Sequence, residues 1–170
     1  MLVLFMRHAK AVEAKPGERD EERKLSPEGI EEAVTTSRFI PKVKIVYSSP
    51  LRRAIETAEI VSQAHRVEYR VLEELAPGHY LKDVEPYFTD RALLISHSPY
   101  VEDYVAELTG YRPVIPTAGV VGTRKTGGIW LIEFFITPQY AREIVERMSR
   151  YYSTGRSEKE LHSSGLNLLR

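Results

Sequence analysis

The sequence predicts an α/β fold in which helices cover both faces of a mostly parallel sheet. Apolar segments typical of buried strands alternate along the chain with segments whose apolar residues recur at helical spacing. The chain has 170 residues, the length of one domain, and shows no internal repeat or second domain boundary. We therefore expect a single-domain, three-layer α/β/α sandwich over residues 1–152, followed by a polar, loosely ordered tail over residues 153–170.

The first half of the chain contains three expected strands and two expected helices. Residues 2–6 form a continuous apolar run, which suits a buried strand that ends at Arg7-His8. The polar stretch that follows, residues 10–24, is long for a connector, and such length is typical of a functional or mobile loop. The next segments are expected to form a helix, a strand, a helix and a strand over residues 26–39, 43–47, 49–65 and 67–71.

The second half of the chain begins with a Glu-rich turn that contains Pro77-Gly78. Short helical and apolar patterns then predict a helix over 81–88, a strand over 92–95 and a helix over 98–108. Two strands over 119–124 and 129–136 and a helix over 137–152 complete the domain. Lys125-Thr126-Gly127-Gly128 separates the last two strands, which indicates a hairpin.

Four of these helices are expected to begin at a hydroxyl residue followed by proline. A serine or threonine oxygen can accept a hydrogen bond from a free N–H of the first turn, and proline is favoured at the first helical position. The four pairs are Ser26-Pro27, Ser49-Pro50, Ser98-Pro99 and Thr137-Pro138.

The composition argues against several classes of protein. The 24 basic residues balance the 24 acidic ones, so there is no overall basic field for nucleic acid. The absence of cysteine excludes disulfides, thiolate metal sites and a cysteine nucleophile. No apolar run approaches the ~20 residues that span a bilayer, and no signal-peptide pattern is visible. We therefore expect a cytoplasmic protein without a membrane or nucleic-acid partner.

Three segments with chemically useful side chains lie where a predicted strand ends. They are Arg7-His8, residues 48–53 with Arg53, and residues 96–99 with His97. The carboxyl ends of parallel strands are the usual place of ligand sites in open α/β sheets. Guanidinium groups and helix N-termini both favour phosphoryl oxygens. The sequence therefore predicts a phosphate pocket at this edge of the sheet.

These segments resemble the motifs of the histidine phosphatase (phosphoglycerate mutase-like) superfamily. The similarity runs in the family's order from about residue 2 to residue 110 and looks closest to the short, SixA-like phosphohistidine phosphatase branch. Its motifs are Arg7-His8-Ala9-Lys10, residues 25–29, 49–58 and 72–75, and Ile95-Ser96-His97. The resemblance implies a phosphoglycerate mutase-like fold.

The resemblance also implies a mechanism and a set of roles. His8 would attack phosphorus and carry a phosphohistidine intermediate, while Arg7, Arg53 and His97 would stabilise the charge of the transferring group. Glu74 matches the family's proton donor, and Arg23 matches a loop arginine that binds phosphate. The neighbouring guanidinium groups are expected to lower the pKa of His8 and keep its ring neutral. Metal and other cofactors are not expected.

Some assignments stay open at the level of the sequence. The family's usual glycine after Arg-His is Ala9 here, and Lys10 either adds charge at the rim or points into water. Glu73 competes with Glu74, and Arg52 with Arg53. Arg23 lies in a charged loop where a solvated side chain is equally consistent. The remaining histidines carry no motif and are expected at the surface: His65, His79 and His162.

Together the residues predict a metal-independent phosphatase that acts on a phosphohistidine in a protein or on another phosphomonoester. The stretches on either side of Glu74, residues 54–73 and 75–96, are too short to hold a helical lid, so the pocket should accept a phosphorylated protein as partner. A small phosphorylated substrate remains the alternative, with a mutase or small-molecule phosphatase as the activity. The other alternative is an inactive phosphate-binding module.

Overall fold

A six-stranded sheet forms the centre of the protein in the computed structural model, which describes residues 1–17 and 19–153. The strand order across the sheet is β3-β2-β4-β1-β5-β6. The pairs β3–β2, β2–β4 and β4–β1 are parallel, whereas β5 is antiparallel to both of its neighbours. The strands are β1 (Leu2–Arg7), β2 (Ile45–Ser48), β3 (Tyr69–Val71), β4 (Ala92–Ser96), β5 (Val120–Thr126) and β6 (Ile129–Ile136). The mostly parallel sheet predicted from the sequence is therefore confirmed.

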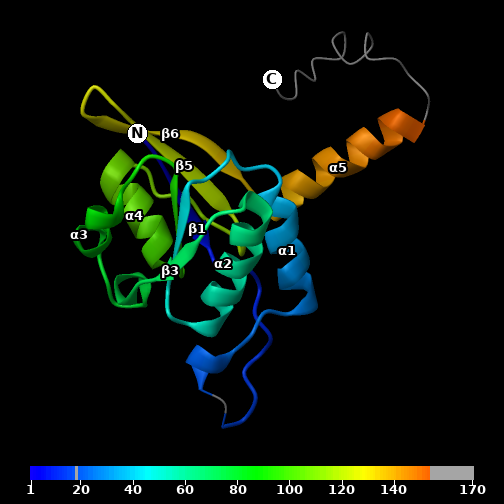
Figure 1. The fold of residues 1–170 in the computed structure, drawn as a ribbon, viewed down its shortest axis with the longest axis horizontal. Coiled ribbons are helices and arrows are strands. Elements are labelled where there is room, and N and C mark those ends of the chain that lie inside the picture. Colours follow the sequence, from blue (N-terminus) through cyan, green and yellow to red (C-terminus); the bar gives the residue numbers. More distant parts are fainter. Residues whose placement is uncertain (18, 154–170) are drawn as a thin grey trace.

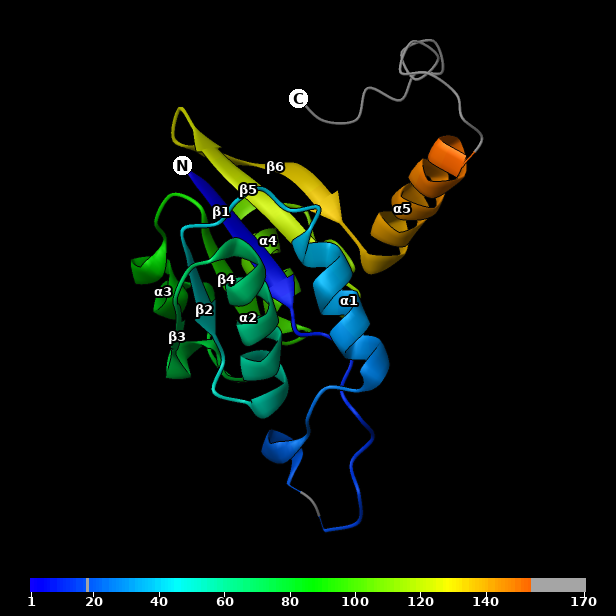
Figure 2. The same cartoon turned by 45° about the vertical axis from the view of Figure 1, so that its right-hand side comes forward.

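Helices cover both faces of this sheet (Figures 1 and 2). One face carries α1 (Pro27–Ser37) and α2 (Arg52–His65), and the other carries α3 (Leu81–Val84) and α4 (Tyr100–Thr109). Along β1, the side chains of Leu4 and Met6 join one core cluster and those of Val3 and Phe5 join the other. A strand buried on both faces needs a continuous apolar run, which explains the sequence of β1 and confirms the three-layer sandwich.

The last helix, α5 (Pro138–Ser153), extends away from the sheet after its first turns (Figure 2). Ala141 and Ile144 are buried near its start, whereas Val145 and Met148 are exposed further along. The tail predicted beyond it, from residue 154 onwards, lies outside the described residues. Across the described ranges, no helix has the length and apolar character needed to cross a bilayer.

The predicted helix starts are right at two positions and wrong at the other two. Ser26 accepts a hydrogen bond from Gly29 N at 3.0 Å, and Thr137 accepts one from Tyr140 N at 3.1 Å. In contrast, α2 begins only at Arg52 and α4 only at Tyr100. The hydroxyl of Ser49 instead bonds His97, 48 residues away, and that of Ser98 donates to the Glu102 side chain one turn later, so neither accepts the expected cap from the first turn.

Three short 3₁₀ helices refine the predicted pattern. The helix expected over residues 81–88 is divided into α3 and η3 (Glu85–Tyr87), where Pro86 lacks the N–H that would continue an α-helix. The Glu-rich turn contains η2 (Glu73–Leu75). The polar stretch after β1 contains η1 (Asp20–Glu22), which the sequence did not indicate. Two of these elements carry acidic residues near the predicted site, Asp20 on η1 and Glu74 on η2.

Candidate active site

The parallel strands bring the predicted segments to one edge of the sheet. Arg7 is the register partner of Ser96, and Ser48 is that of Ile95, so β1, β2 and β4 end side by side. The backbone N–H of His8 donates to Ser96 O at 3.0 Å, and its carbonyl accepts from Ala118 N at 3.2 Å. The backbone at His8 is thus fixed from both neighbouring strands.

The ring of His8 has a defined orientation. Its Nδ1 lies 2.8 Å from Ala9 O, and because a carbonyl only accepts, Nδ1 carries the proton in the neutral ring. The other nitrogen, Nε2, then presents a lone pair, which accepts a hydrogen bond from Arg53 Nε at 3.2 Å. This tautomer leaves the ring's lone pair on Nε2.

The pKa of His8 is lowered to about 4, mainly by burial, and the nearby charges of Arg53, Arg7 and Arg23 contribute in the same direction. The hydrogen bond to Ala9 works against this shift. The sequence predicted the effect of the guanidinium groups, but desolvation is the larger cause. At neutral pH the ring is therefore uncharged, which a nitrogen nucleophile requires.

Arg53 lies beside His8 and is almost fully enclosed, with 8% of its side chain exposed. Each of its three nitrogens donates a hydrogen bond. Nε reaches His8, NH1 reaches the backbone oxygen of Asp20 at 2.7 Å, and NH2 reaches Asp20 Oδ2 at 2.9 Å. The neighbouring Arg52 is exposed and pairs with Glu56 on its own helix. Of the two arginines, the structure brings Arg53 to the site.

Asp20 joins two of the predicted arginines. Its Oδ1 accepts from Arg23 NH1 at 2.8 Å, while Oδ2 accepts from Arg53. The hydrogen bonds from Arg23 and Arg53 hold the pKa of the Asp20 carboxyl below its ordinary value. Arg23 also donates from Nε to Val12 O at 2.9 Å, which fixes its side chain across the base of the loop. Sequence reasoning missed Asp20, because nothing in the charged loop distinguishes it from Glu21 or Glu22.

His97 lies next to His8, with ring centroids 4.9 Å apart. Its Nε2 is 2.7 Å from Ser49 Oγ. Burial lowers its pKa to about 3, and the neighbouring His8 and Arg53 contribute to this shift. Within the described residues, Nδ1 of His97 and Nε of Arg7 are buried without a hydrogen-bond partner. Buried polar nitrogens are almost always paired, so two at one site indicate a polar ligand.

The Arg7 side chain is held by a second nitrogen of its guanidinium group, since NH1 donates to Ile115 O at 3.1 Å.

Glu74 is half-buried on η2, and its Oε1 accepts from Tyr87 Oη at 3.0 Å, while Glu73 is exposed. The hydroxyl of Ser96 donates to Leu75 O at 2.9 Å, which ties η2 to the end of β4 beside His97. No hydrogen bond joins Glu74 to His8, Arg53 or His97 in the described part of the chain.

The remaining residues of the second motif connect the loops around the site. Thr57 Oγ1 donates to Arg53 O at 2.7 Å and accepts from Ala9 N at 3.1 Å. Glu56 accepts from Leu25 N at 2.7 Å, which links α2 to the segment before α1. The helix that carries Arg53 is therefore bonded directly to the backbone beside His8.

The motif at residues 25–29 also has a structural reason. The carbonyl oxygen of Lys10 accepts from Ser26 N at 2.9 Å and from Ser26 Oγ at 3.2 Å. It lies so close to Gly29 that an added Cβ would be 2.0 Å away. Only glycine allows this approach, which holds the chain just after His8 against α1. The Lys10 side chain is exposed and pairs with Glu28 of α1 at 2.5 Å.

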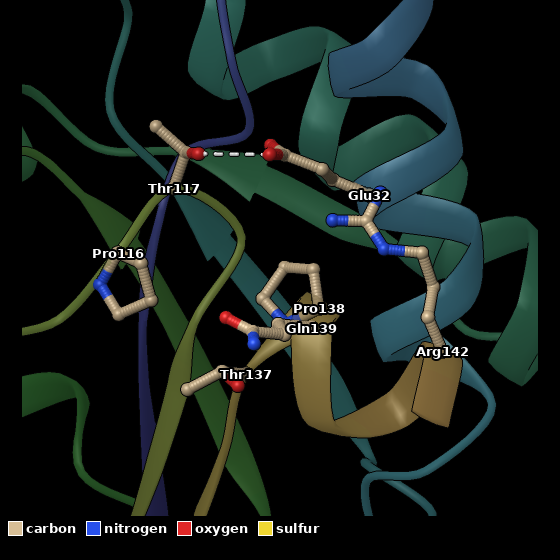
Figure 3. Close-up of a pocket in the computed structure, with 7 residues that line it drawn as sticks. All are labelled: Glu32, Pro116, Thr117, Thr137, Pro138, Gln139 and Arg142. Carbon is tan, nitrogen blue, oxygen red and sulfur yellow. Dashed lines mark hydrogen bonds between the residues drawn. The ribbon is translucent and has the colours of Figure 1, made fainter. Parts of the chain in front are cut away.

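Glu32 is a second residue that the sequence did not reveal. It is 6% exposed, and its carboxylate accepts from Lys10 N and from Thr117 Oγ1, both at 3.1 Å. Figure 3 shows it on one wall of a pocket of about 240 Å³ between α1, the segment before β5 and the start of α5. None of the predicted site residues lines this pocket, so it is separate from the candidate active site.

Other sequence expectations can be placed as well. His65 is buried rather than at the surface, because its Nε2 donates to Ser37 O at 3.0 Å and its Nδ1 accepts from Val43 N. His79 is half-buried, 3.6 Å from Asp83, and His162 lies outside the described residues. Over residues 1–17 and 19–153, no group of three His, Asp or Glu side chains has the arrangement of a metal site.

Comparisons with known proteins agree with this geometry. A model of the histidine phosphatase superfamily (branch 1) matches residues 3–82. The protein histidine phosphatase SixA in complex with tungstate is 26% identical, with a TM-score of 0.74 over 82% of this chain and 98% of that chain. No curated protein sequence matches.

Two further solved structures share the fold. A SixA-type protein from Agrobacterium tumefaciens is 23% identical, with a TM-score of 0.68 over 81% of this chain and 97% of that chain. A phosphoserine phosphatase from Entamoeba histolytica, in complex with phosphoserine, is 15% identical, with a TM-score of 0.64 over 82% of this chain and 98% of that chain.

Proposed function

We propose that His8 is the nucleophile of this phosphatase, whose residues 3–82 match the histidine phosphatase superfamily, and that a phosphorylated protein side chain is its substrate. The observation that carries the proposal is the state of the His8 ring. It is neutral, with the lone pair of Nε2 turned toward guanidinium groups that bind phosphoryl oxygens.

The first step transfers the phosphoryl group to His8. Nε2 attacks phosphorus, an N–P bond forms, and the bond from phosphorus to the substrate's nitrogen or oxygen breaks. The leaving atom keeps the electron pair of that bond and takes a proton from Glu74. Arg7, Arg53 and His97 donate hydrogen bonds to the three equatorial oxygens and stabilise their charge in the transition state. The unpartnered nitrogens of Arg7 and His97 support these roles.

The second step releases phosphate and restores the ring. Water attacks the phosphorus of the phosphohistidine, its proton passes to Glu74, and the N–P bond breaks with its electron pair returning to Nε2. The same groups serve both steps, so the residues account for hydrolysis without a further reactant. Glu74 has this role in the proposal because η2 is held beside His97 through Ser96 and because it is less exposed than Glu73.

The short elements after η2 support a protein substrate. Leu81 and Val84 of α3 point into the core under the second face of the sheet, as do Tyr87 and Phe88 around η3. Because these side chains are held in the core, we infer that α3 and η3 do not form a helical lid over His8. An open site can accept a side chain on another protein, whereas small metabolites usually benefit from closure. The 26% identity to a protein histidine phosphatase points to the same substrate class, phosphohistidine.

A trapping experiment tests the nucleophile. The protein is mixed rapidly with a phosphohistidine-containing carrier protein and quenched, and we expect acid-labile phosphate on the peptide that contains His8. The His8→Ala variant should carry no label. Label on a different residue of the native protein would refute His8 as the nucleophile.

A substrate panel tests the substrate class. Turnover of the phosphohistidine carrier is compared with that of p-nitrophenyl phosphate and of small phosphosugars. We expect the highest kcat/KM with the carrier protein. Hydrolysis of phosphosugars alone would assign the enzyme to small metabolites instead.

A further inference from the structure

The carboxylate of Asp20 occupies the guanidinium group of Arg53, which the proposed function assigns to phosphate, and also that of Arg23. Its two oxygens accept from Arg53 NH2 at 2.9 Å and from Arg23 NH1 at 2.8 Å, and its backbone oxygen accepts from Arg53 NH1 at 2.7 Å. A planar anion bridging two guanidinium groups reproduces the way in which phosphoryl oxygens bind arginine. Asp20 therefore holds the donor atoms that a phosphoryl group would need.

The same arrangement engages the nucleophile. Two nitrogens of Arg53 bind Asp20, and the third, Nε, donates to Nε2 of His8 at 3.2 Å. The lone pair that attacks phosphorus is thus occupied by a hydrogen bond. Productive binding requires Arg53 to turn from His8 and Asp20 toward the phosphoryl oxygens.

Asp20 is attached to the body of the protein mainly through these polar contacts. It lies on η1, which has no buried residue, and 57% of its side chain is exposed. The base of the loop is held by the hydrogen bond from Val12 N to Lys24 O at 2.9 Å. The carboxylate is charged at neutral pH, because the pKa of Asp20 is below its ordinary value. It can leave Arg53 without disturbing the core.

We propose that Asp20 is an internal competitor of the substrate, whose phosphoryl group displaces the Asp20 carboxylate from Arg53 and Arg23. This inference rests on the proposed function, since it takes Arg53 as a phosphate ligand. A ligand carboxylate carries one negative charge, as Asp20 does, so the exchange brings no additional attraction to the arginines. A dianionic phosphoryl group carries two, and the second charge is attracted by Arg7 and Arg53. Displacement of Asp20 therefore sets an energetic threshold that a dianionic phosphoryl group exceeds and that a ligand carboxylate only matches.

Binding of inorganic anions tests this exchange without turnover. The Kd values of phosphate and tungstate are measured at pH 7.5 by calorimetry for the native protein, for Asp20→Asn and for Glu22→Gln. Glu22 is the matched control, since it lies on the same 3₁₀ helix and pairs with Arg19 outside the site. We expect Asp20→Asn to bind both anions at least about fivefold more tightly, and Glu22→Gln to bind them as the native protein does.

The same variants test the threshold. Acetate should also gain affinity and should bind measurably to Asp20→Asn but not to the native protein. Equal or weaker binding of phosphate by Asp20→Asn would overturn the inference and make Asp20 a residue that positions Arg53. An equal gain in Glu22→Gln would also overturn it, because general electrostatics would then explain the effect. The proposed function fails on a separate observation, the absence of phosphate on His8 in the trapping experiment.

Discussion

Two regions that meet at the same site are held in different ways. The strand-end cluster, which consists of Arg7, His8, Arg53 and His97, is carried by β1, β4 and α2 and fixed by bonds between backbone groups and buried side chains. The charged loop, residues 10–17 and 19–24, reaches the cluster through the exposed side chain of Asp20 and the partly exposed side chain of Arg23. Strands and a helix therefore position the residues of the proposed reaction, whereas the loop contributes through polar side-chain contacts.

The largest difference in activity should appear between a variant of the strand-end cluster, His8→Ala, and a variant of the charged loop, Arg23→Ala. We expect His8→Ala to lower kcat at least about a thousandfold, because it removes the attacking atom. Arg23→Ala should lower kcat/KM less than about tenfold, since a partly exposed cation contributes less to the transition state. Steady-state rates with the phosphohistidine carrier measure both. A greater loss for Arg23→Ala would make the loop an equal part of the catalytic machinery.

A second comparison concerns two adjacent arginines within α2. Arg53→Ala should lower kcat/KM about a hundredfold, because it removes a buried charge-assisted donor to the phosphoryl group. Arg52→Ala, its matched control, removes the same charge from an exposed ion pair and should change kcat/KM less than about twofold. Similar losses in both variants would show that overall charge, and not the position beside His8, determines activity.

Acid titration distinguishes the buried ring from an ordinary histidine. Burial lowers the pKa of His8 to about 4, so protonation should begin only well below pH 6.5, the ordinary value. Below about pH 4 the attack by Nε2 should weaken about tenfold per pH unit, because the proton occupies its lone pair. Nuclear magnetic resonance of the ring, assigned with His8→Ala, measures the pKa independently of the substrate. A midpoint near 6.5 would contradict the enclosed geometry.

The smallest expected effect is on the attachment of the loop to α1. Gly29→Ala places a Cβ against Lys10 O, and we expect the free energy of unfolding to fall by about 2 kcal/mol. Glu31→Ala is the control, since it adds the same helix-forming residue at an exposed position of α1. Urea unfolding measures both variants. Unchanged stability in Gly29→Ala would show that the loop moves freely past α1.

The sequence located the members of the strand-end cluster because each follows a recognisable strand. The apolar run before Arg7-His8 and the apolar strand before Ser96-His97 mark the edge of the sheet, and parallel pairing brings the two ends together. Asp20 was not found, since its role depends on how the loop packs against α2, 33 residues away in the chain. Glu32 was hidden for the same reason, because its partners Lys10 and Thr117 come from distant segments.

Two of the four local helix-start signals failed because the serine hydroxyl has a different partner. Ser49 and Ser98 carry the pattern of helix caps, but their hydroxyls bond His97 and Glu102, and the helices begin later. Ser26 and Thr137 cap their helices as predicted, and the Ser26 hydroxyl does so while it also donates to Lys10 O.

The sequence by itself determined the order of strands and helices, the burial of β1 on both faces and the identity of the histidines and arginines at the strand ends. These follow from periodicity and from the rule that parallel strands end at one edge. Only the tertiary structure decided which tautomer His8 adopts, that burial rather than charge chiefly lowers its pKa, and which carboxylate holds Arg53. Those properties depend on distances between atoms remote in sequence, which the fold alone sets.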